Sequence, residues 1–147
     1  MIVPAKGFDQ GFEWFDASRE GRLRRSDIVL PAALEWLASA GDRRFFLYLH
    51  LMEPHAPYVP LEEGRRLFAA EVPRGFDPRK TVDYSWELQR AGFTSAGEPR
   101  TTEVVSPEEQ AWIHALYDGC VWSADHYVGL LLARLEELGL TENTIVA

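Results

Sequence analysis

The chain has 147 residues, of which 46% are hydrophobic and 26% charged, a composition typical of one globular domain with a sizeable core. Its net charge of −8, with no basic stripe, argues against non-specific nucleic-acid binding. No apolar run approaches the roughly 18 residues of a membrane-spanning helix, so we expect no membrane segment. The single cysteine, Cys120, excludes an intramolecular disulfide. None of these features indicates a cellular compartment.

The N-terminal part of the chain predicts an irregular lead-in followed by a helix. Residues 1–25 are rich in glycine and charge and carry several aromatic side chains. Residues 26–40 place apolar side chains at helical spacing, with Ser26 as a predicted N-cap and Gly41 as a predicted stop. Pro31 suits the first turn of a helix better than its interior, so a later start is an alternative.

A buried strand is predicted next, over residues 45–51 (FFLYLHL). The run is short, aromatic and apolar at both odd and even positions, which is typical of a strand buried on both faces of a parallel sheet. Residues 52–105 are rich in proline and glycine, and we expect a long loop with one short helix near 61–69. A loop of this length inside a domain is usually functional.

A long helix is predicted after this loop. Ser106 is its expected N-cap, Pro107 fits the first helical position, and Glu109 completes a capping box. Gly139 is its expected end, and residues 144–147 (TIVA) begin a second β-branched strand. A strand–helix–strand order implies a parallel pair joined by a right-handed crossover, so the predicted fold class is α/β.

The densest polar cluster, HLMEPHAPY (residues 50–58), follows the first predicted strand. In open α/β sheets, ligands bind beyond the carboxyl ends of the strands. Pro54 and Pro57 restrict the backbone on both sides of His55 and so limit the directions of its side chain. A histidine held in this way can donate a charge-assisted hydrogen bond to an oxyanion or act as a general acid. The alternative is a loop histidine that only caps backbone carbonyl groups.

Three segments, in order, resemble one known family. FFLYLHLMEPHAPYVP (45–60) resembles the sulfatase family of the alkaline phosphatase superfamily, in which a strand leads into a Pro-His-x-Pro-Tyr turn. KGFDQGFEWFDA (6–17) resembles the lead-in of that family, and YDGCVWSADHYVGLLLARLEELGLTENTIV (117–146) resembles its long helix and following strand. The resemblance therefore covers nearly the whole chain.

The resemblance implies an alkaline-phosphatase-like α/β fold, a mainly parallel sheet flanked by helices. On this interpretation residues 1–147 are a fragment of a single catalytic domain, truncated at both ends. The chain stops inside an apolar β-branched run, which fits that expectation.

The function implied by resemblance is hydrolysis of sulfate esters or sulfamates. In that family a formylglycine, made within a Cys/Ser-x-Pro-x-Arg motif, attacks sulfur, and a divalent cation, usually calcium, neutralises the sulfate oxygens. By resemblance His55 is the catalytic residue that contacts the sulfate or its leaving oxygen, and Tyr58 is a second substrate contact. The sequence contains neither the nucleophile motif nor the family's metal ligands, so we expect no bound cation and no activity in this chain alone. The substrate of the full-length parent would be a sulfated small molecule or glycan.

Two alternatives remain open at this stage. One is a phosphodiesterase or phosphoethanolamine-type transferase of the same superfamily, and the other is a non-catalytic remnant that only binds another chain. Among the other polar residues, His50 is predicted to be a paired core histidine. Cys120 lacks the nucleophile motif and is predicted to be a small buried hydrophobic residue.

Overall fold

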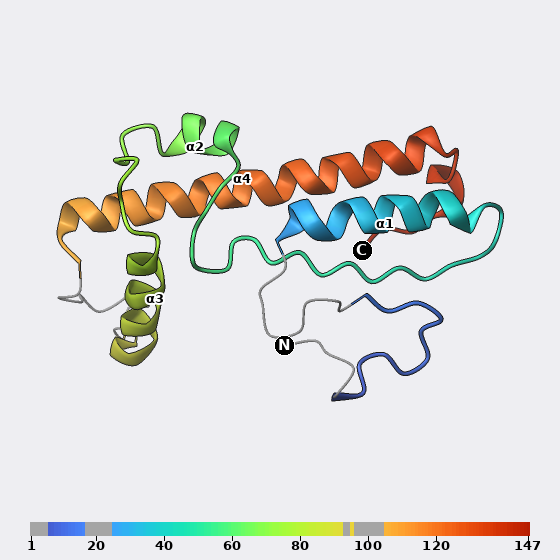
Figure 1. Cartoon of the computed structure of the whole chain (residues 1–147), viewed down its shortest axis with the longest axis horizontal. Helices are drawn as coiled ribbons and strands as arrows, with labels where there is room; N and C mark the ends of the chain where they lie inside the picture. Colours follow the sequence, from blue (N-terminus) through green and yellow to red (C-terminus); the bar gives the residue numbers. More distant parts are fainter. Residues whose placement is uncertain (1–5, 17–24, 93–94, 96–104) are drawn as a thin grey trace.

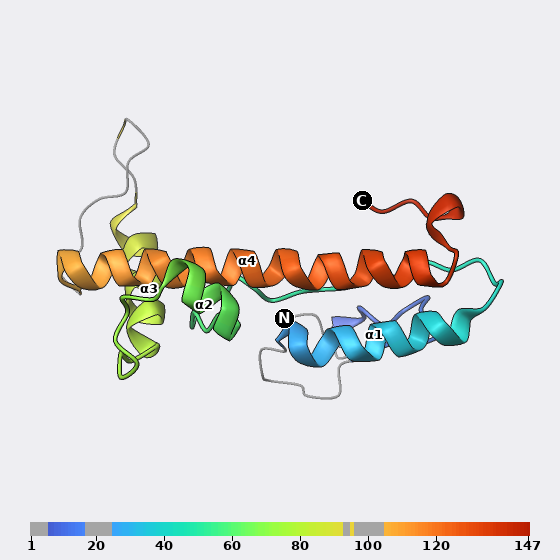
Figure 2. The same cartoon turned by 90° about the horizontal axis from the view of Figure 1, so that it is seen from above.

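The computed structural model of the chain describes residues 6–16, 25–92, 95 and 105–147. These residues form the α-helices α1 (Ser26–Ala40), α2 (Glu62–Phe68), α3 (Arg79–Ala91) and α4 (Pro107–Glu137), followed by the 3₁₀ helix η2 (Thr141–Asn143). Figure 1 shows α4 running along the length of the molecule, with α1 beside its C-terminal half and with α2 and α3 near its N-terminal half. The view from above in Figure 2 shows the same arrangement.

Helix α4 begins and ends as the sequence predicts. The Ser106 hydroxyl accepts a hydrogen bond from the Glu109 N–H at 3.1 Å, and the Glu109 carboxylate accepts one from the Ser106 N–H at 3.0 Å. Lys80 of α3 forms an ion pair with Glu109. This pair and the capping hydrogen bond lower the pKa of Glu109. At the other end Gly139 has a φ of +67°, which allows the chain to turn out of the helix.

Helix α1 spans the predicted residues 26–40, but its N-cap residue differs from the prediction. Ser26 is the first helical residue, and the preceding Arg25 makes no side-chain cap. Because the helix already begins at Ser26, Pro31 lies inside it. Gly41 follows the last residue with a φ of +58°, as its predicted role as a stop requires. The prediction that Ser26 is the N-cap is therefore wrong by one residue.

Helix α2 packs against α4 through two glycines. A Cβ atom on Gly64 would lie 2.6 Å from the Gly119 carbonyl oxygen, a distance that real Cβ atoms do not reach. The absent side chains therefore let the two helix backbones approach closely. Side chains of α4 then complete two small hydrophobic clusters, whose buried members are Ala69, Val72 and Leu116 in one and Tyr84, Val105 and Ile113 in the other.

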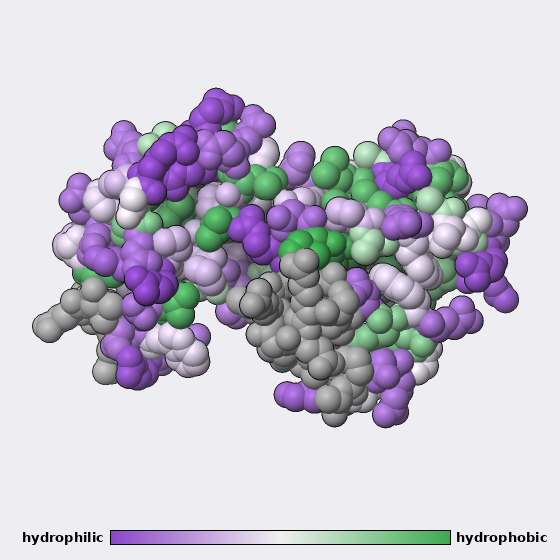
Figure 3. Space-filling view, viewed as in Figure 1, coloured by the Kyte–Doolittle hydropathy of each residue, from purple (hydrophilic) through white to green (hydrophobic). Residues whose placement is uncertain are grey.

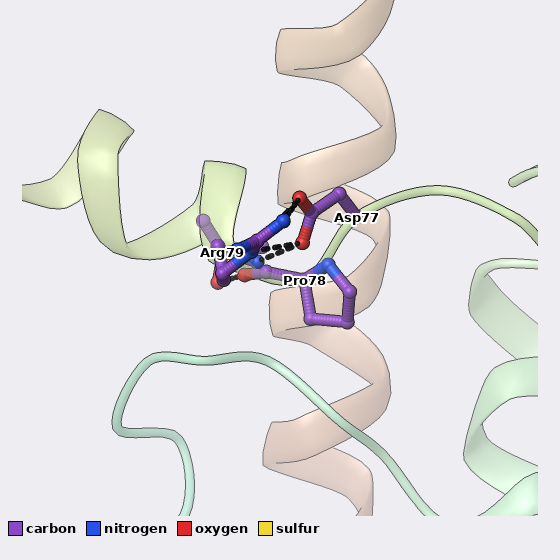
Figure 4. A network of polar contacts seen from close by, with 4 residues as sticks. Asp77, Pro78 and Arg79 are labelled. Carbon is purple, nitrogen blue, oxygen red and sulfur yellow. Dashed lines mark hydrogen bonds and ion pairs between the residues drawn. The ribbon is translucent and has the colours of Figure 1, made fainter.

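Helix α3 lies within the segment that was predicted to be a long loop. The side of α3 that faces the rest of the chain includes Thr81, Tyr84, Ser85 and Leu88, which recur at helical spacing but include the polar Thr81 and Ser85. Its start is organised by Asp77, whose carboxylate accepts hydrogen bonds from the Arg79 N–H at 2.9 Å and from the Arg79 guanidinium (Figure 4). The Arg79 contacts lower the pKa of Asp77.

The predicted α/β fold with a mainly parallel sheet is wrong, because the described residues contain helices and no strand. Residues 45–51 run beside α1 without regular secondary structure (Figure 1). Within the described part of the chain, no backbone hydrogen bond joins residues 45–51 to another segment. Residues 144–147 likewise follow η2 without forming a strand, although Thr144 is extended. The apolar pattern predicted a strand at 45–51, but a strand needs a paired neighbour, and none of the described residues pairs with this segment.

Candidate active site

His55 lies in a turn between residues 45–51 and α2. Its N–H donates a hydrogen bond to the Met52 carbonyl oxygen at 2.7 Å. The peptide bonds that precede Pro54 and Pro57 are both cis. The His55 side chain is exposed, and its Nδ1 atom lies 2.6 Å from the Ala56 carbonyl oxygen. The turn therefore presents the imidazole to solvent in a defined orientation.

The contact with Ala56 determines which ring nitrogen of His55 remains available. A carbonyl oxygen can only accept a hydrogen bond, so Nδ1 carries the proton and donates it. Among the described residues, Nε2 has no hydrogen-bond partner. A neutral His55 therefore offers Nε2 as an acceptor, and a protonated His55 offers Nε2–H as a donor. The second form suits an anionic ligand or a leaving oxygen.

The carboxylate of Glu53, two residues before His55, connects this turn to the first turn of α1. The Glu53 carboxylate accepts hydrogen bonds from the Ser26 N–H, at 3.2 Å, and from the Ser26 hydroxyl. A negative charge is favourable at this end of a helix, where backbone N–H groups have no partner within the helix. Glu53 thus supplies the cap that Arg25 does not, and it holds the loop at the same time.

Two further hydroxyls hold the other side of residues 52–61, which we call the anchored loop. The Tyr58 N–H donates to the Thr81 hydroxyl of α3 at 3.1 Å. The Leu61 N–H donates to the Ser123 hydroxyl of α4 at 2.9 Å, and Ser123 in turn donates to the Gly119 carbonyl oxygen at 2.7 Å. The anchored loop is therefore bonded to α1, α3 and α4.

The three hydroxyl residues that hold the anchored loop are also the buried polar residues of the described chain. The exposed fractions of Ser26, Thr81 and Ser123 are 0%, 0% and 1%. Sequence reasoning named Ser26 only as a helix cap, and it did not single out Thr81 or Ser123. A usable signal exists for Ser123, because it shares the buried face of α4 with Cys120 and Tyr127 at helical spacing. A polar residue on such a face must find a hydrogen-bond partner.

Tyr58 lies three residues after His55 but is directed into the core. Its hydroxyl lies 3.3 Å from the Ser85 hydroxyl, and its ring packs edge-on against Tyr117 with the centroids 5.4 Å apart. It also packs against both hydrophobic clusters. Within the described residues no hydrogen bond or ring contact joins Tyr58 to His55. A substrate contact by Tyr58 stays a prediction.

Comparison with known proteins gives one family. The model of the family described as Sulfatase matches residues 6–147 of the chain. The chain belongs to the sulfatase family. This confirms the resemblance inferred from the Pro-His-x-Pro-Tyr turn and its flanking segments, and it supports a hydrolase-type activity at the level of the family. No curated protein and no solved structure matches the chain.

Cys120 does not have the properties of a nucleophile in this member of the sulfatase family. Its thiol is buried in α4, and burial raises its pKa to about 11. The thiol therefore stays protonated at neutral pH, and the prediction of a small buried residue is confirmed. Burial likewise raises the pKa of Tyr127 nearby, and the carboxylates of Asp27 and Glu53 add to the effect.

His50 lies at the surface and not in the core, where it was predicted. The sequence favoured a paired histidine in the core, but the side chain of His50 is exposed. Its ring stacks on Tyr48 with the centroids 6.3 Å apart. The prediction is wrong because residues 45–51 are packed on one side only, so alternate side chains of the segment remain at the surface.

The described residues do not fit a divalent cation. Within the described ranges, no group of three or more His, Cys, Asp or Glu side chains is arranged to hold a metal ion. A hard cation such as calcium needs six to eight oxygen ligands, so the donor set around His55 is insufficient. No described helix is both long enough and apolar enough to cross a membrane.

Proposed function

We propose that the chain forms part of the catalytic domain of a sulfatase that hydrolyses sulfate esters or sulfamates, with His55 in its active site. One observation carries this proposal. The three buried polar side chains among the described residues, Ser26, Thr81 and Ser123, all hold the loop that carries His55. A catalytic group must be held in a fixed position, and a fixed loop with an exposed imidazole meets this requirement.

The geometry of His55 suits two steps of ester cleavage. While Nδ1–H remains bonded to the Ala56 carbonyl oxygen, a protonated imidazole donates Nε2–H to a sulfate oxygen. As a nucleophile from outside this sequence bonds to sulfur and the bond from sulfur to the ester oxygen breaks, the Nε2 proton passes to that leaving oxygen. General acid catalysis of this kind contributes about 10²- to 10⁴-fold to the rate. Tyr58 is the second proposed contact, through a hydroxyl that would exchange Ser85 for a substrate oxygen.

The proposal assigns the remaining catalytic groups to residues outside this sequence. The 147 residues contain no Cys/Ser-x-Pro-x-Arg motif. We therefore expect the chain alone to leave sulfate esters intact, with or without calcium. In the whole protein the proposed substrate is a sulfated small molecule or glycan.

The test uses the longer protein that is encoded by this reading frame together with its flanking coding sequence. We expect calcium-dependent hydrolysis of 4-nitrophenyl sulfate and of an alkyl sulfate, and no comparable hydrolysis of bis-4-nitrophenyl phosphate. His55→Ala is compared with His114→Ala, which removes an exposed histidine from α4. We expect His114→Ala to keep the activity of the parent.

The two substrates separate the two roles of His55. A nitrophenolate leaving group departs as the anion, whereas an alkoxide leaving group must be protonated as it departs. Loss of a general acid therefore lowers kcat for the alkyl sulfate by about 10²- to 10⁴-fold and affects the nitrophenyl ester much less. Loss of sulfate binding lowers both rates equally. An unchanged rate on both substrates would refute the assignment of His55, and a preference for the phosphate diester would favour the phosphodiesterase alternative.

A further inference from the structure

Residues 45–57 have one hydrogen-bonded connection to another part of the described chain. It belongs to Glu53, whose carboxylate accepts hydrogen bonds from the N–H and the hydroxyl of Ser26 at the start of α1. The next such connection comes after His55, where the Tyr58 N–H donates to the Thr81 hydroxyl. His55 therefore lies between two attachment points, two residues after Glu53 and three residues before Tyr58.

The Glu53 side chain directs both of its carboxylate oxygens at α1. Oε1 and Oε2 lie 3.2 and 3.3 Å from the Ser26 nitrogen, and Oε2 also accepts from the Ser26 hydroxyl. Hydrophilic residues cover much of the face that Figure 3 shows, as expected for side chains in contact with water, whereas Glu53 is half-buried and Ser26 is fully buried. The contact thus joins a fixed point of the core to the turn that carries His55.

Glu53 does not orient the His55 imidazole by touching it. The Nδ1 atom of His55 is bonded to the Ala56 carbonyl oxygen, and within the described residues no hydrogen bond or ion pair joins the Glu53 carboxylate to the ring. The carboxylate therefore acts through the backbone. Pro54 and Pro57 restrict the backbone between the two attachment points, so a restraint at residue 53 is carried to His55 and to the carbonyl group that directs its ring.

We propose that Glu53 is a positioning residue for His55, because its contact with Ser26 fixes the backbone from which Nε2 reaches the leaving oxygen. This inference rests on the proposed function, in which His55 is the general acid. A proton donor acts only within hydrogen-bond reach of its acceptor, and a displacement of about 1 Å can lower a rate by about 10²-fold. Without the carboxylate, no described hydrogen bond joins residues 45–57 to another element, and the turn is held only through Tyr58.

The test measures kcat for an alkyl sulfate in the longer protein that contains this chain. Glu53→Ala should lower kcat by about 10- to 10²-fold. Glu53→Gln should stay within about threefold of the parent, because its side-chain oxygen still reaches Ser26 and accepts hydrogen bonds there. The matched control is Asp27→Asn, which removes a charge from the same first turn of α1. Asp27 pairs with Arg25 at 3.5 Å and has no described contact with the His55 turn, so this variant should keep the kcat of the parent.

A double-mutant cycle with His55→Ala separates positioning from general damage to the fold. If Glu53 acts through His55, adding Glu53→Ala to His55→Ala should lower kcat by less than about twofold further. Circular dichroism checks that each variant keeps its helices. If Glu53→Ala does not fold, Ser26→Ala removes one hydrogen bond at the other end of the same contact and is compared in the same two backgrounds.

The outcomes distinguish this inference from the proposed function. An unchanged kcat for Glu53→Ala, beside a loss for His55→Ala, overturns the positioning role and leaves the proposed function standing. An equal loss from Glu53→Ala in both backgrounds also overturns the positioning role, because Glu53 then supports the fold and not His55. So does a loss for Glu53→Gln as large as the loss for Glu53→Ala. An unchanged kcat for His55→Ala overturns the proposed function itself and this inference with it.

Discussion

Replacing Ser123 by alanine removes the hydroxyl that bonds the anchored loop to α4. Ser123 is 1% exposed, and its oxygen accepts the Leu61 N–H at 2.9 Å. Without it that N–H loses its partner, which costs about 1–3 kcal/mol. Alanine favours a helix more than serine does, and this returns about 0.5 kcal/mol. We expect the free energy of unfolding to fall by about 0.5–2.5 kcal/mol, with a Tm lower by about 1–10 °C.

Urea unfolding followed by far-UV circular dichroism measures this change, and Ser39→Ala is its control. The Ser39 hydroxyl also donates to a carbonyl of its own helix, that of Trp36 at 2.7 Å, but it is exposed and holds no loop. Its replacement should stabilise the chain by about 0.5 kcal/mol. The m-values of the two variants should agree. Equal stabilities for Ser123→Ala and Ser39→Ala would refute the view that Ser123 holds the loop.

Three further predictions follow from single sites. Gly64→Ala places a Cβ atom 2.6 Å from the Gly119 carbonyl oxygen and should destabilise the chain by about 1–3 kcal/mol. A Cβ atom at Gly129 meets nothing within 4 Å, so Gly129→Ala should stabilise the chain by about 1 kcal/mol. The Tm values of the two variants should therefore lie on opposite sides of the wild-type value. Because the thiol pKa of Cys120 is raised to about 11, a thiol reagent at neutral pH should react slowly with the native chain and rapidly in urea, and rapid native labelling would contradict its burial. The pKa of Glu109 is lowered from 4.5, so its contribution to stability is present above that value and is lost as the pH falls through the lowered pKa. Between about pH 6 and pH 3, the urea midpoint of unfolding should therefore fall less for Glu109→Gln than for the wild type.

The candidate site was only partly predictable. The prolines around His55 predicted a constrained histidine, whereas the role that the resemblance to sulfatases gives to His55 stays a prediction. The residues that hold the loop were not predicted, because Glu53 reaches Ser26 across 27 positions and Leu61 reaches Ser123 across 62. Local patterns carry no information about such distant pairs.

Helix α3 was missed because the local sequence favours a loop, whereas the contacts that stabilise the helix come from distant parts of the chain. Prolines and glycines in residues 52–105 favour loops, and the buried face of α3 begins with the polar Thr81. Its stability depends on contacts that the sequence does not display, such as the ion pair between Lys80 and Glu109 and the packing of Tyr84 with Ile113. Tertiary packing therefore outweighed the local signal.

Local chemistry in the sequence was enough to determine several features by itself. Ser106, Pro107 and Glu109 determined the start of α4, and Gly139 its end, because caps and turns depend on residues a few positions apart. The apolar run at 45–51, in contrast, predicted a strand buried on both faces, and among the described residues no strand forms there. Only the tertiary structure decided that this segment packs on helices instead of in a sheet and that three buried hydroxyls hold the His55 loop. The physical reason is that a strand and a buried hydroxyl each need a partner, and the partner is chosen by the folding of the whole chain.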